Sequence, residues 1–190
     1  LDSTSKIPAL LGENFLLLSG IAIALLCLAY MIFFIVKYRE LGLLASFSLI
    51  IYGILNLFFL QALPITLLTL GGLIGIVVGL GLNFVAHYMI FKNINKEYGY
   101  GKKIPLSVKT GFQKSTMPIV DMNVVVIIAN VILWFFGNAF VKSLCLSLCL
   151  ASIFTLFTAL LVTRGLVKWY LPFNSTNSKK MGLTRKENVD

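Results

Sequence analysis

One uncharged run restricts the fold more than any other feature. Residues 41–91 form a stretch of 51 residues without Asp, Glu, Lys or Arg. Three shorter uncharged runs are residues 15–36, 122–141 and 143–163. A helix crosses the hydrocarbon core of a bilayer with about 20 apolar residues, so the long run supplies two crossings and each shorter run one. Barrel strands would instead alternate over about ten residues. The sequence therefore predicts an all-α, polytopic membrane helix bundle with five transmembrane helices.

The uncharged runs also predict how the chain is divided. An external segment, residues 1–14, precedes the first span, a cytoplasmic loop, residues 92–117, joins the third span to the fourth, and a cytoplasmic tail occupies residues 171–190. Within the loop, residues 105–115 are typical of a short amphipathic helix lying on the membrane surface. The predicted spans lie at about residues 15–36, 42–61, 65–91, 118–138 and 141–166.

The basic residues predict the orientation. The chain is 58% hydrophobic and 12% charged, which excludes an ordinary soluble domain. Its net charge of +9 would suggest nucleic acid in a soluble protein, but 14 of the 16 Lys and Arg residues follow the first, third or fifth span. These ends share one side if the helices alternate, and basic loops mark the cytoplasm. We therefore expect no nucleic acid, a multi-pass protein of the cell membrane with its N-terminus outside and its C-terminus inside, and lysines that face anionic lipids.

The N-terminal end carries a further expectation. Residues 1–14 are polar and lead into the first span from outside, and the first span is too long for a signal peptide. An external N-terminus without a signal suggests a fragment of a longer chain.

The third span has a distinctive face. Gly71, Gly75, Gly79, Asn83 and His87 recur every four residues, which places them along one side of a helix. Three glycines at this spacing allow a neighbouring backbone to approach closely, so we expect them to mediate helix packing. The same face ends in two polar residues, Asn83 and His87.

One acid lies inside a predicted span. Asp121 is three residues beyond Pro118, about 5 Å into its helix, and His87 is five residues before Lys92, about 7 Å from its helix end. Both ends face the cytoplasm, so the two groups share a depth. They are either a functional pair or shallow enough to reach water or lipid head groups. Asn123 and Asn130 share a face of the same helix and are expected to form hydrogen bonds to another helix.

Known catalytic motifs are missing. The chain has one His, no GxxxxGK loop and no GxGxxG, and Asp121 has no second carboxylate with which to form a catalytic pair. We therefore predict no enzyme activity, no metal site and no cofactor.

Several segments resemble the SecD family. Residues 69–97, TLGGLIGIVVGLGLNFVAHYMIFKNINKE, are similar without gaps to its fourth membrane helix, and residues 118–123, PIVDMN, to its second Asp-x-Asn element. Residues 134–138, WFFGN, are similar to its FFGTG turn. The final-helix pattern FTAxxVTR and the YRxxGLLAS loop match residues 154–164 and 38–46. The resemblance covers about residues 8–170.

The resemblance implies a function. It identifies the chain as spans two to six of SecD, one half of a transporter of the resistance-nodulation-division (RND) superfamily. SecD pairs with SecF, joins the SecYEG channel, with YajC and YidC as further partners, and uses the proton gradient to help exported polypeptides complete translocation. The large external domain of the family would precede Leu1.

The chain departs from the family at one position that matters. The family's first Asp-Ala-Asn falls on Val85, Ala86 and His87, so the acid implied to carry protons is replaced by Val85, whereas the second element keeps Asp121 and Asn123. Either His87 with Asp121 substitutes for the lost acid, or this half has lost its relay function. Two other functions stay open: an RND-type exporter half for small molecules or lipids, and a non-conducting scaffold of the translocon.

Overall fold

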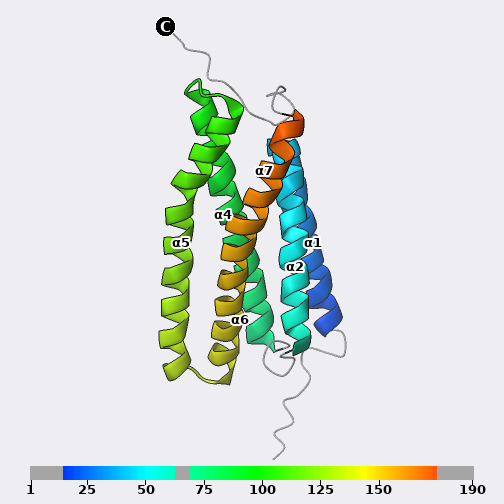
Figure 1. Ribbon diagram of the computed structural model, residues 1–190. Coiled ribbons are helices and arrows are strands. Elements are labelled where there is room, and N and C mark those ends of the chain that lie inside the picture. The colour runs from blue at the N-terminus through cyan, green and yellow to red at the C-terminus, as the bar shows by residue number, and fades with distance from the viewer. Residues whose placement is uncertain (1–14, 63–68, 175–190) are drawn as a thin grey trace, which may run out of the picture.

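The computed structural model describes residues 15–62 and 69–174, and the structural statements below concern these residues. They form a bundle of long helices without a strand (Figure 1). Five stretches are long and apolar enough to cross a membrane, which confirms the predicted fold class. The helices are α1 (Phe15–Tyr38), α2 (Glu40–Ala62), α4 (Leu70–Gly99), α5 (Ile104–Phe136) and α6 (Ala139–Leu156), which continues through a π-helical segment η1 (Phe157–Val162) into α7 (Thr163–Asn174).

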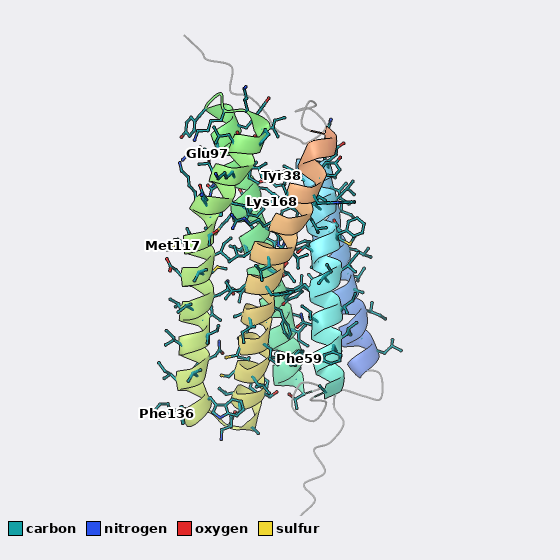
Figure 2. All side chains as sticks on the ribbon, in the orientation of Figure 1. Tyr38, Phe59, Glu97, Met117, Phe136 and Lys168 are labelled. Atoms are coloured by element: carbon teal, nitrogen blue, oxygen red, sulfur yellow. The ribbon has the colours of Figure 1, made fainter. Side chains whose placement is uncertain are left out.

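The helices alternate in direction, so the basic residues gather at one end. The end that holds the α1–α2 connection, the α4–α5 turn and α7 is here called the lysine-rich end (Figure 1). Glu97, Tyr38 and Lys168 lie toward this end, whereas Phe59 and Phe136 lie toward the opposite end (Figure 2). The alternation expected from the charge pattern is therefore present.

Helix α4 packs closely against α6 through its glycines. A Cβ atom on Gly71 would overlap the carbonyl oxygen of Phe140, and one on Gly75 would overlap the side chain of Ser147. A Cβ on Gly79 would overlap that of Ala151. These close approaches make α4 and α6 the centre of the bundle, while α1 and α5 lie at its periphery and have few buried residues.

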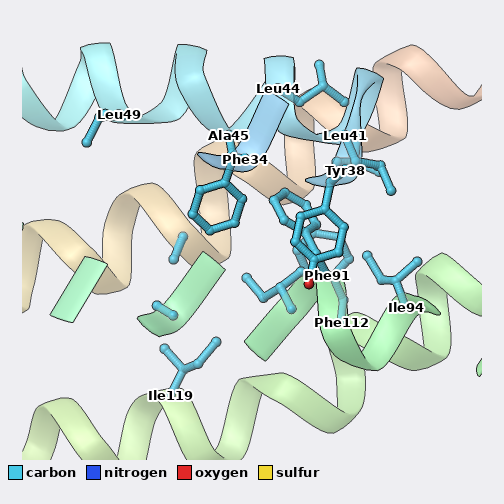
Figure 3. Packing of buried hydrophobic residues seen from close by; sticks show 14 of the residues in the cluster. Phe34, Tyr38, Leu41, Leu44, Ala45, Leu49, Phe91, Ile94, Phe112 and Ile119 are labelled. Atoms are coloured by element: carbon cyan, nitrogen blue, oxygen red, sulfur yellow. The ribbon is translucent and has the colours of Figure 1, made fainter. Parts of the chain in front are cut away.

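The aromatic core lies in the lysine-rich half. Phe34 of α1 and Phe91 of α4 are fully buried, with ring centroids 5.7 Å apart, and Tyr38 lies 5.3 Å from Phe91. Figure 3 shows these rings with residues from α2 and α5, including Ala45, Phe112 and Ile119. Burial of large rings is strongly stabilising, so this half fixes how α1, α2, α4 and α5 meet.

The connection between α1 and α2 is a single residue. Arg39 has a φ of 47°, a left-handed conformation that reverses the chain without a loop. Three residues later, Gly42 lies against the backbone of Phe34, where a Cβ would overlap the Phe34 carbonyl. The absent side chain at Gly42 thus allows the start of α2 to lie directly against the end of α1 after such a short turn.

The predicted loop 92–117 is mostly helical. Helix α4 extends to Gly99, α5 begins at Ile104, and the turn between them uses Gly101 at a φ of 83°. The amphipathic segment 105–115 exists, but it is the start of α5 and not a separate surface helix. It packs along α4 because Gly111 lies directly on the backbone of Ile94, which covers its apolar side.

Helix α5 also continues through Pro118. A proline removes one backbone donor and usually marks a helix start or a kink, which is why the sequence predicts a boundary here. Among the predicted segments, residues 1–14 lie outside the described residues. The predicted tail 171–190 begins within α7, which ends at Asn174, and the rest of the tail also lies outside them.

Candidate functional site

The two polar residues of α4 are buried in a hydrogen-bonded network. Asn83 and His87 have no exposed surface. The Tyr30 hydroxyl of α1 donates to Asn83 Oδ1 at 3.2 Å, and Asn83 Nδ2 donates to Thr158 Oγ1 of η1 at 3.0 Å. His87 Nε2 lies 2.8 Å from Thr163 Oγ1 of α7. The network therefore joins α1 and α4 to the last helix.

The partners of His87 determine which ring nitrogen carries hydrogen. Nδ1 lies 2.9 Å from the Asn83 carbonyl oxygen, which can only accept, so Nδ1 donates. In a neutral ring Nε2 is then an acceptor and takes the hydrogen of the Thr163 hydroxyl. In a protonated ring Nε2 would donate, and the Thr163 hydroxyl would have to turn toward another acceptor.

That other acceptor is present. Thr163 Oγ1 lies 2.9 Å from Ser48 Oγ of α2 and 3.0 Å from the Thr158 carbonyl oxygen. The Thr158 carbonyl also accepts from Ser48 Oγ at 3.1 Å and from the backbone N–H of Thr163. This carbonyl can face Ser48 because the π-helical turn displaces it from the ordinary helix ladder. The geometry supports two hydroxyl orientations, one for each charge state of His87.

The polar residues of α5 are arranged differently. Asp121 is exposed, while Asn123 is buried. The predicted hydrogen bonds from Asn123 and Asn130 to another helix are not seen among the described residues: their side-chain amides donate to the carbonyls of Ile119 and Val126, at 2.8 and 2.7 Å, within α5 itself. An amide four residues from a carbonyl can place its N–H group on that carbonyl, and both side chains do so here. The Oδ1 atom of Asn123 has no partner among the described residues.

His87 and Asp121 share a depth but not a face. Ser115 of α5 donates to the Met89 carbonyl at 3.2 Å and accepts from Asn93 at 2.8 Å. Six residues further along the antiparallel helices, Asp121 lies level with residues 83–87. His87 is fully buried and bonded to Thr163, whereas Asp121 is exposed. The hypothetical His87–Asp121 contact is not formed.

Val85 lies on an outer side of α4. Its side chain is 40% exposed, in contrast to the buried ring of His87 two positions later. Two helix positions correspond to a rotation of about 200°, so the two side chains point in nearly opposite directions. His87 therefore does not place a titratable group where the side chain at position 85 points.

Glu97 is a buried acid that the sequence analysis did not single out. It lies beyond Lys92, outside the predicted membrane-spanning segment, with its side chain only 2% exposed and 2.5 Å from the ammonium groups of both Lys102 and Lys114. The hydrogen bonds from Lys102 and then Lys114 lower the pKa of Glu97 and outweigh the opposing effect of burial. The only feature of the sequence that could have indicated its role is that Glu97 is an acid in a connecting segment with six lysines.

The described residues contain no group of three His, Cys, Asp or Glu side chains that could hold a metal ion. The site chemistry they offer is hydrogen bonding and charge in a mostly apolar bundle. The groups involved lie on several helices, so their hydrogen bonds link these helices to one another.

Comparison with known proteins decides the family. No model of a protein family matches the chain. Curated relatives include the protein translocase subunit SecD of Dehalococcoides mccartyi (strain VS), 35% identical over 178 residues, which are 91% of this chain and 39% of the relative. SecD of Dictyoglomus turgidum is 34% identical over 80% of this chain and 38% of its own length. SecD of Synechocystis sp. is 33% identical over 85% of this chain and 34% of its own length.

The chain belongs to the SecD family. It spans about two fifths of the length of the curated SecD relatives that it matches. The hydrogen-bonded network and the exposed acid of α5 thus belong to a SecD-like membrane region.

Proposed function

We propose that this protein is a SecD-like membrane subunit of the bacterial protein-export machinery. In the cell membrane it would assist secreted polypeptides through the SecYEG channel, with the proton motive force as the energy source. The observation that carries this proposal is the similarity to proteins named protein translocase subunit SecD over most of the chain.

Complementation tests the export role. Cells depleted of their own SecD accumulate unprocessed precursor of a secreted protein. Expression of this protein, together with the SecF of the same source, is expected to restore processing. The control is the same plasmid without the gene for this protein. If the protein is made and inserted but the precursor still accumulates, the export role is wrong.

The exposed faces of α4 and α5 support a partner half. Val78 and Val85 of α4 and Val125 of α5 are each at least 40% exposed, and Asp121 lies exposed among such residues. A carboxylate facing lipid tails costs about 3 kcal/mol or more near the bilayer centre, and less toward the interface. We propose that a SecF-like half covers this face and that Asp121 meets polar groups or water there.

In this proposal, Asp121 and His87 have different roles. Asp121 would take and release the proton at the interface with the partner half. His87 would connect α4 to α2 and α7 through Thr163, so its role is positional. Val85 cannot change charge and would have no part in proton transfer.

A reconstituted system separates the possibilities. In proteoliposomes with SecYEG, SecA and the partner half, Asp121→Asn is expected to abolish the stimulation of translocation by a proton gradient. His87→Gln keeps a hydrogen-bonding group without a titratable site and is expected to keep most of the stimulation. The matched control is Glu40→Gln, which removes an acid outside the spans. An unaffected Asp121→Asn variant would favour a non-conducting scaffold, and complete loss in His87→Gln would favour relay through His87.

One observation favours a second candidate, an RND-type exporter of small molecules or lipids. A cavity of about 470 Å³ lies between α1, α2 and α4, lined mainly by apolar residues such as Ile23, Leu49 and Leu73, with Tyr52 and Asn56 as polar members. That volume suits a small apolar molecule. Efflux of such a molecule from vesicles that contain the protein and its partner but no SecYEG would support this function over protein export.

A further inference from the structure

A groove follows α1 and α4 on an outer side of the bundle. Its volume is about 320 Å³, and its walls are apolar side chains from both helices. The α1 wall is formed by Leu26, Ala29 and Phe33, and the α4 wall by Val77, Gly81 and Phe84. Phe33 and Phe84 lie with ring centroids 5.3 Å apart at the end of the groove nearer the lysine-rich end.

Two lysines lie directly beyond that end. Phe84 stacks on Tyr88, and the Lys37 Nζ atom lies 5.0 Å from the Tyr88 ring centroid and 5.2 Å from that of Phe33. The Lys92 Nζ atom lies 5.8 Å from the Tyr88 centroid. Since both ammonium groups are near one ring, the two nitrogens cannot be more than 10.8 Å apart.

These two positive charges have no negative partner among the described residues. The carboxylate of the nearby Glu97 is engaged by Lys102 and Lys114, and neither Lys37 nor Lys92 forms an ion pair. Contacts with aromatic faces orient an ammonium group but do not neutralise it. Two unpaired cations at the mouth of an apolar groove favour a ligand with an anionic head and an apolar tail.

The length of the groove fits one leaflet of a bilayer. Helices α1 and α4 run in the same direction, so both lysines are at the same end (Figure 1). From Leu26 to Lys37 is 11 residues, or about 16 Å of helix. From Val77 to Lys92 is 15 residues, or about 22 Å. Half of a hydrocarbon core is about 15 Å, so an acyl chain whose phosphate lies at the lysines would end near the bottom of the groove.

We propose that the groove between α1 and α4 binds an anionic phospholipid of the leaflet on the lysine-rich side. The phosphate lies between Lys37 and Lys92, and one acyl chain lies along Phe33, Phe84 and Gly81. The site uses none of the residues assigned above to proton transfer.

Competition between lipids tests the site. The protein, purified in detergent, is mixed with equal amounts of phosphatidylglycerol and phosphatidylcholine with the same acyl chains, and bound lipids are counted by native mass spectrometry. Each lysine near an anionic lipid contributes about fivefold in affinity, and phosphatidylcholine loses this attraction to the extent that its choline cation cancels its phosphate charge, so the preference for phosphatidylglycerol is expected to reach at most about 25-fold. Lys37→Gln with Lys92→Gln should remove it, and arginine at both positions should keep it. The matched control replaces Lys103 and Lys109, two lysines away from the groove, by Gln and should leave the preference unchanged.

A second variant tests the apolar part without touching the charges. A Cβ atom on Gly81 meets no neighbour within 4 Å, so Gly81→Leu can fill the groove without straining the helix. It is expected to weaken the binding of both lipids by a similar factor. Glycerophosphoglycerol, which lacks acyl chains, should not compete with phosphatidylglycerol.

Four results would overturn the proposal. The first is equal binding of the two lipids, and the second is the same lipid preference in the Lys37/Lys92 glutamine variant as in the Lys103/Lys109 glutamine control. The third is competition by glycerophosphoglycerol. The fourth is a photoreactive residue at position 81 that cross-links in membranes to a polypeptide and not to lipid.

Discussion

The Thr163 hydroxyl group lies within hydrogen-bonding distance of side chains on two other helices. It lies 2.8 Å from His87 Nε2 and 2.9 Å from Ser48 Oγ, in a position without exposed surface. A hydroxyl has one hydrogen, so it can donate to only one of them at a time. The charge state of His87 therefore decides whether the Thr163 hydroxyl donates to α4 or is turned away from it, toward Ser48 of α2 or the Thr158 carbonyl of η1.

Removal of this hydroxyl should destabilise the bundle. Thr163→Val keeps the shape of the side chain but leaves His87 Nε2 and Ser48 Oγ with fewer partners. An unsatisfied buried polar group costs about 1–3 kcal/mol, and the loss should appear as a lower midpoint of denaturation in detergent. The control is Thr110→Val, since Thr110 is half-buried and its hydroxyl donates to the carbonyl of Leu106 in its own helix. Equal midpoints for the two variants would contradict a structural role for Thr163.

The Glu97 carboxylate gives a pH dependence outside the spans. Its pKa lies below the ordinary value of 4.5, because Lys102 and then Lys114 donate hydrogen bonds to the charged form. The stabilisation is therefore complete above the ordinary pKa and is lost as the pH falls through the lowered pKa. We expect Glu97→Gln to be less stable than the wild type at neutral pH, with the difference shrinking only in acid.

Thermal unfolding of both proteins, followed by circular dichroism between about pH 3 and pH 7, measures that difference. Glu40→Gln is a suitable comparison, because Glu40 is not part of the Lys102–Lys114 cluster. A difference between Glu97→Gln and wild type that stayed constant over the whole pH range would rule out the ion pairs as its cause.

At the scale of helices, length and composition were enough to predict five crossings but not their ends. An uncharged run predicts a span because charges are costly in lipid. The same rule places the end of α4 near Lys92, but the helix continues to Gly99 because Glu97 can be buried once two lysines bond to it. Burial at this position depends on Lys114, 17 residues later in the sequence, and a local pattern cannot reveal it.

The polar site was only partly predictable for a related reason. Asn83 and His87 are conspicuous in an apolar run, so they could be singled out. Their partners Thr158 and Thr163, and Ser48, which bonds to Thr163, are hydroxyl residues, which are common in membrane helices and carry no signal by themselves. The π-helical turn that presents the Thr158 carbonyl to Ser48 also had no marker in the sequence.

The close contact between α4 and α6 predicts that a larger residue at Gly79 destabilises the packing of these two helices. A Cβ on Gly79 would overlap that of Ala151 and lie 2.9 Å from the Tyr52 hydroxyl, so Gly79→Ala must push the helices apart. Overpacking of this kind costs about 1–3 kcal/mol. Gly81→Ala, two residues away, meets no neighbour and should be neutral or stabilising, because Ala favours a helix over Gly by about 1 kcal/mol. Denaturation midpoints in detergent that fell equally in both variants would show that close approach is not what Gly79 provides.

At the scale of the whole molecule, the two ends of the bundle differ in charge and in packing. The lysine-rich end carries the aromatic core and the Glu97 cluster, whereas the opposite end is joined by the short uncharged turn at Gly137 and Asn138. Asn138 caps α6 by accepting from the Val141 N–H at 3.0 Å. An uncharged, capped turn is suited to crossing the membrane during insertion, while the basic end resists crossing.

This asymmetry predicts where each turn lies in the cell. In a variant in which Cys27, Cys145 and Cys149 are replaced by Ala or Ser, a cysteine is introduced either at Tyr100, which is 66% exposed in the α4–α5 turn, or at Ala139, exposed at the start of α6. A maleimide that cannot cross membranes should label Ala139→Cys in intact cells, and Tyr100→Cys only after the cells are opened. The two turns lie at opposite ends of α5. If α5 crosses the bilayer, the turns must be on opposite sides, so only one of the two cysteines can react in intact cells. If Tyr100→Cys reacted in intact cells, the lysine-rich end would face outward, and the proposed lipid would have to come from the outer leaflet.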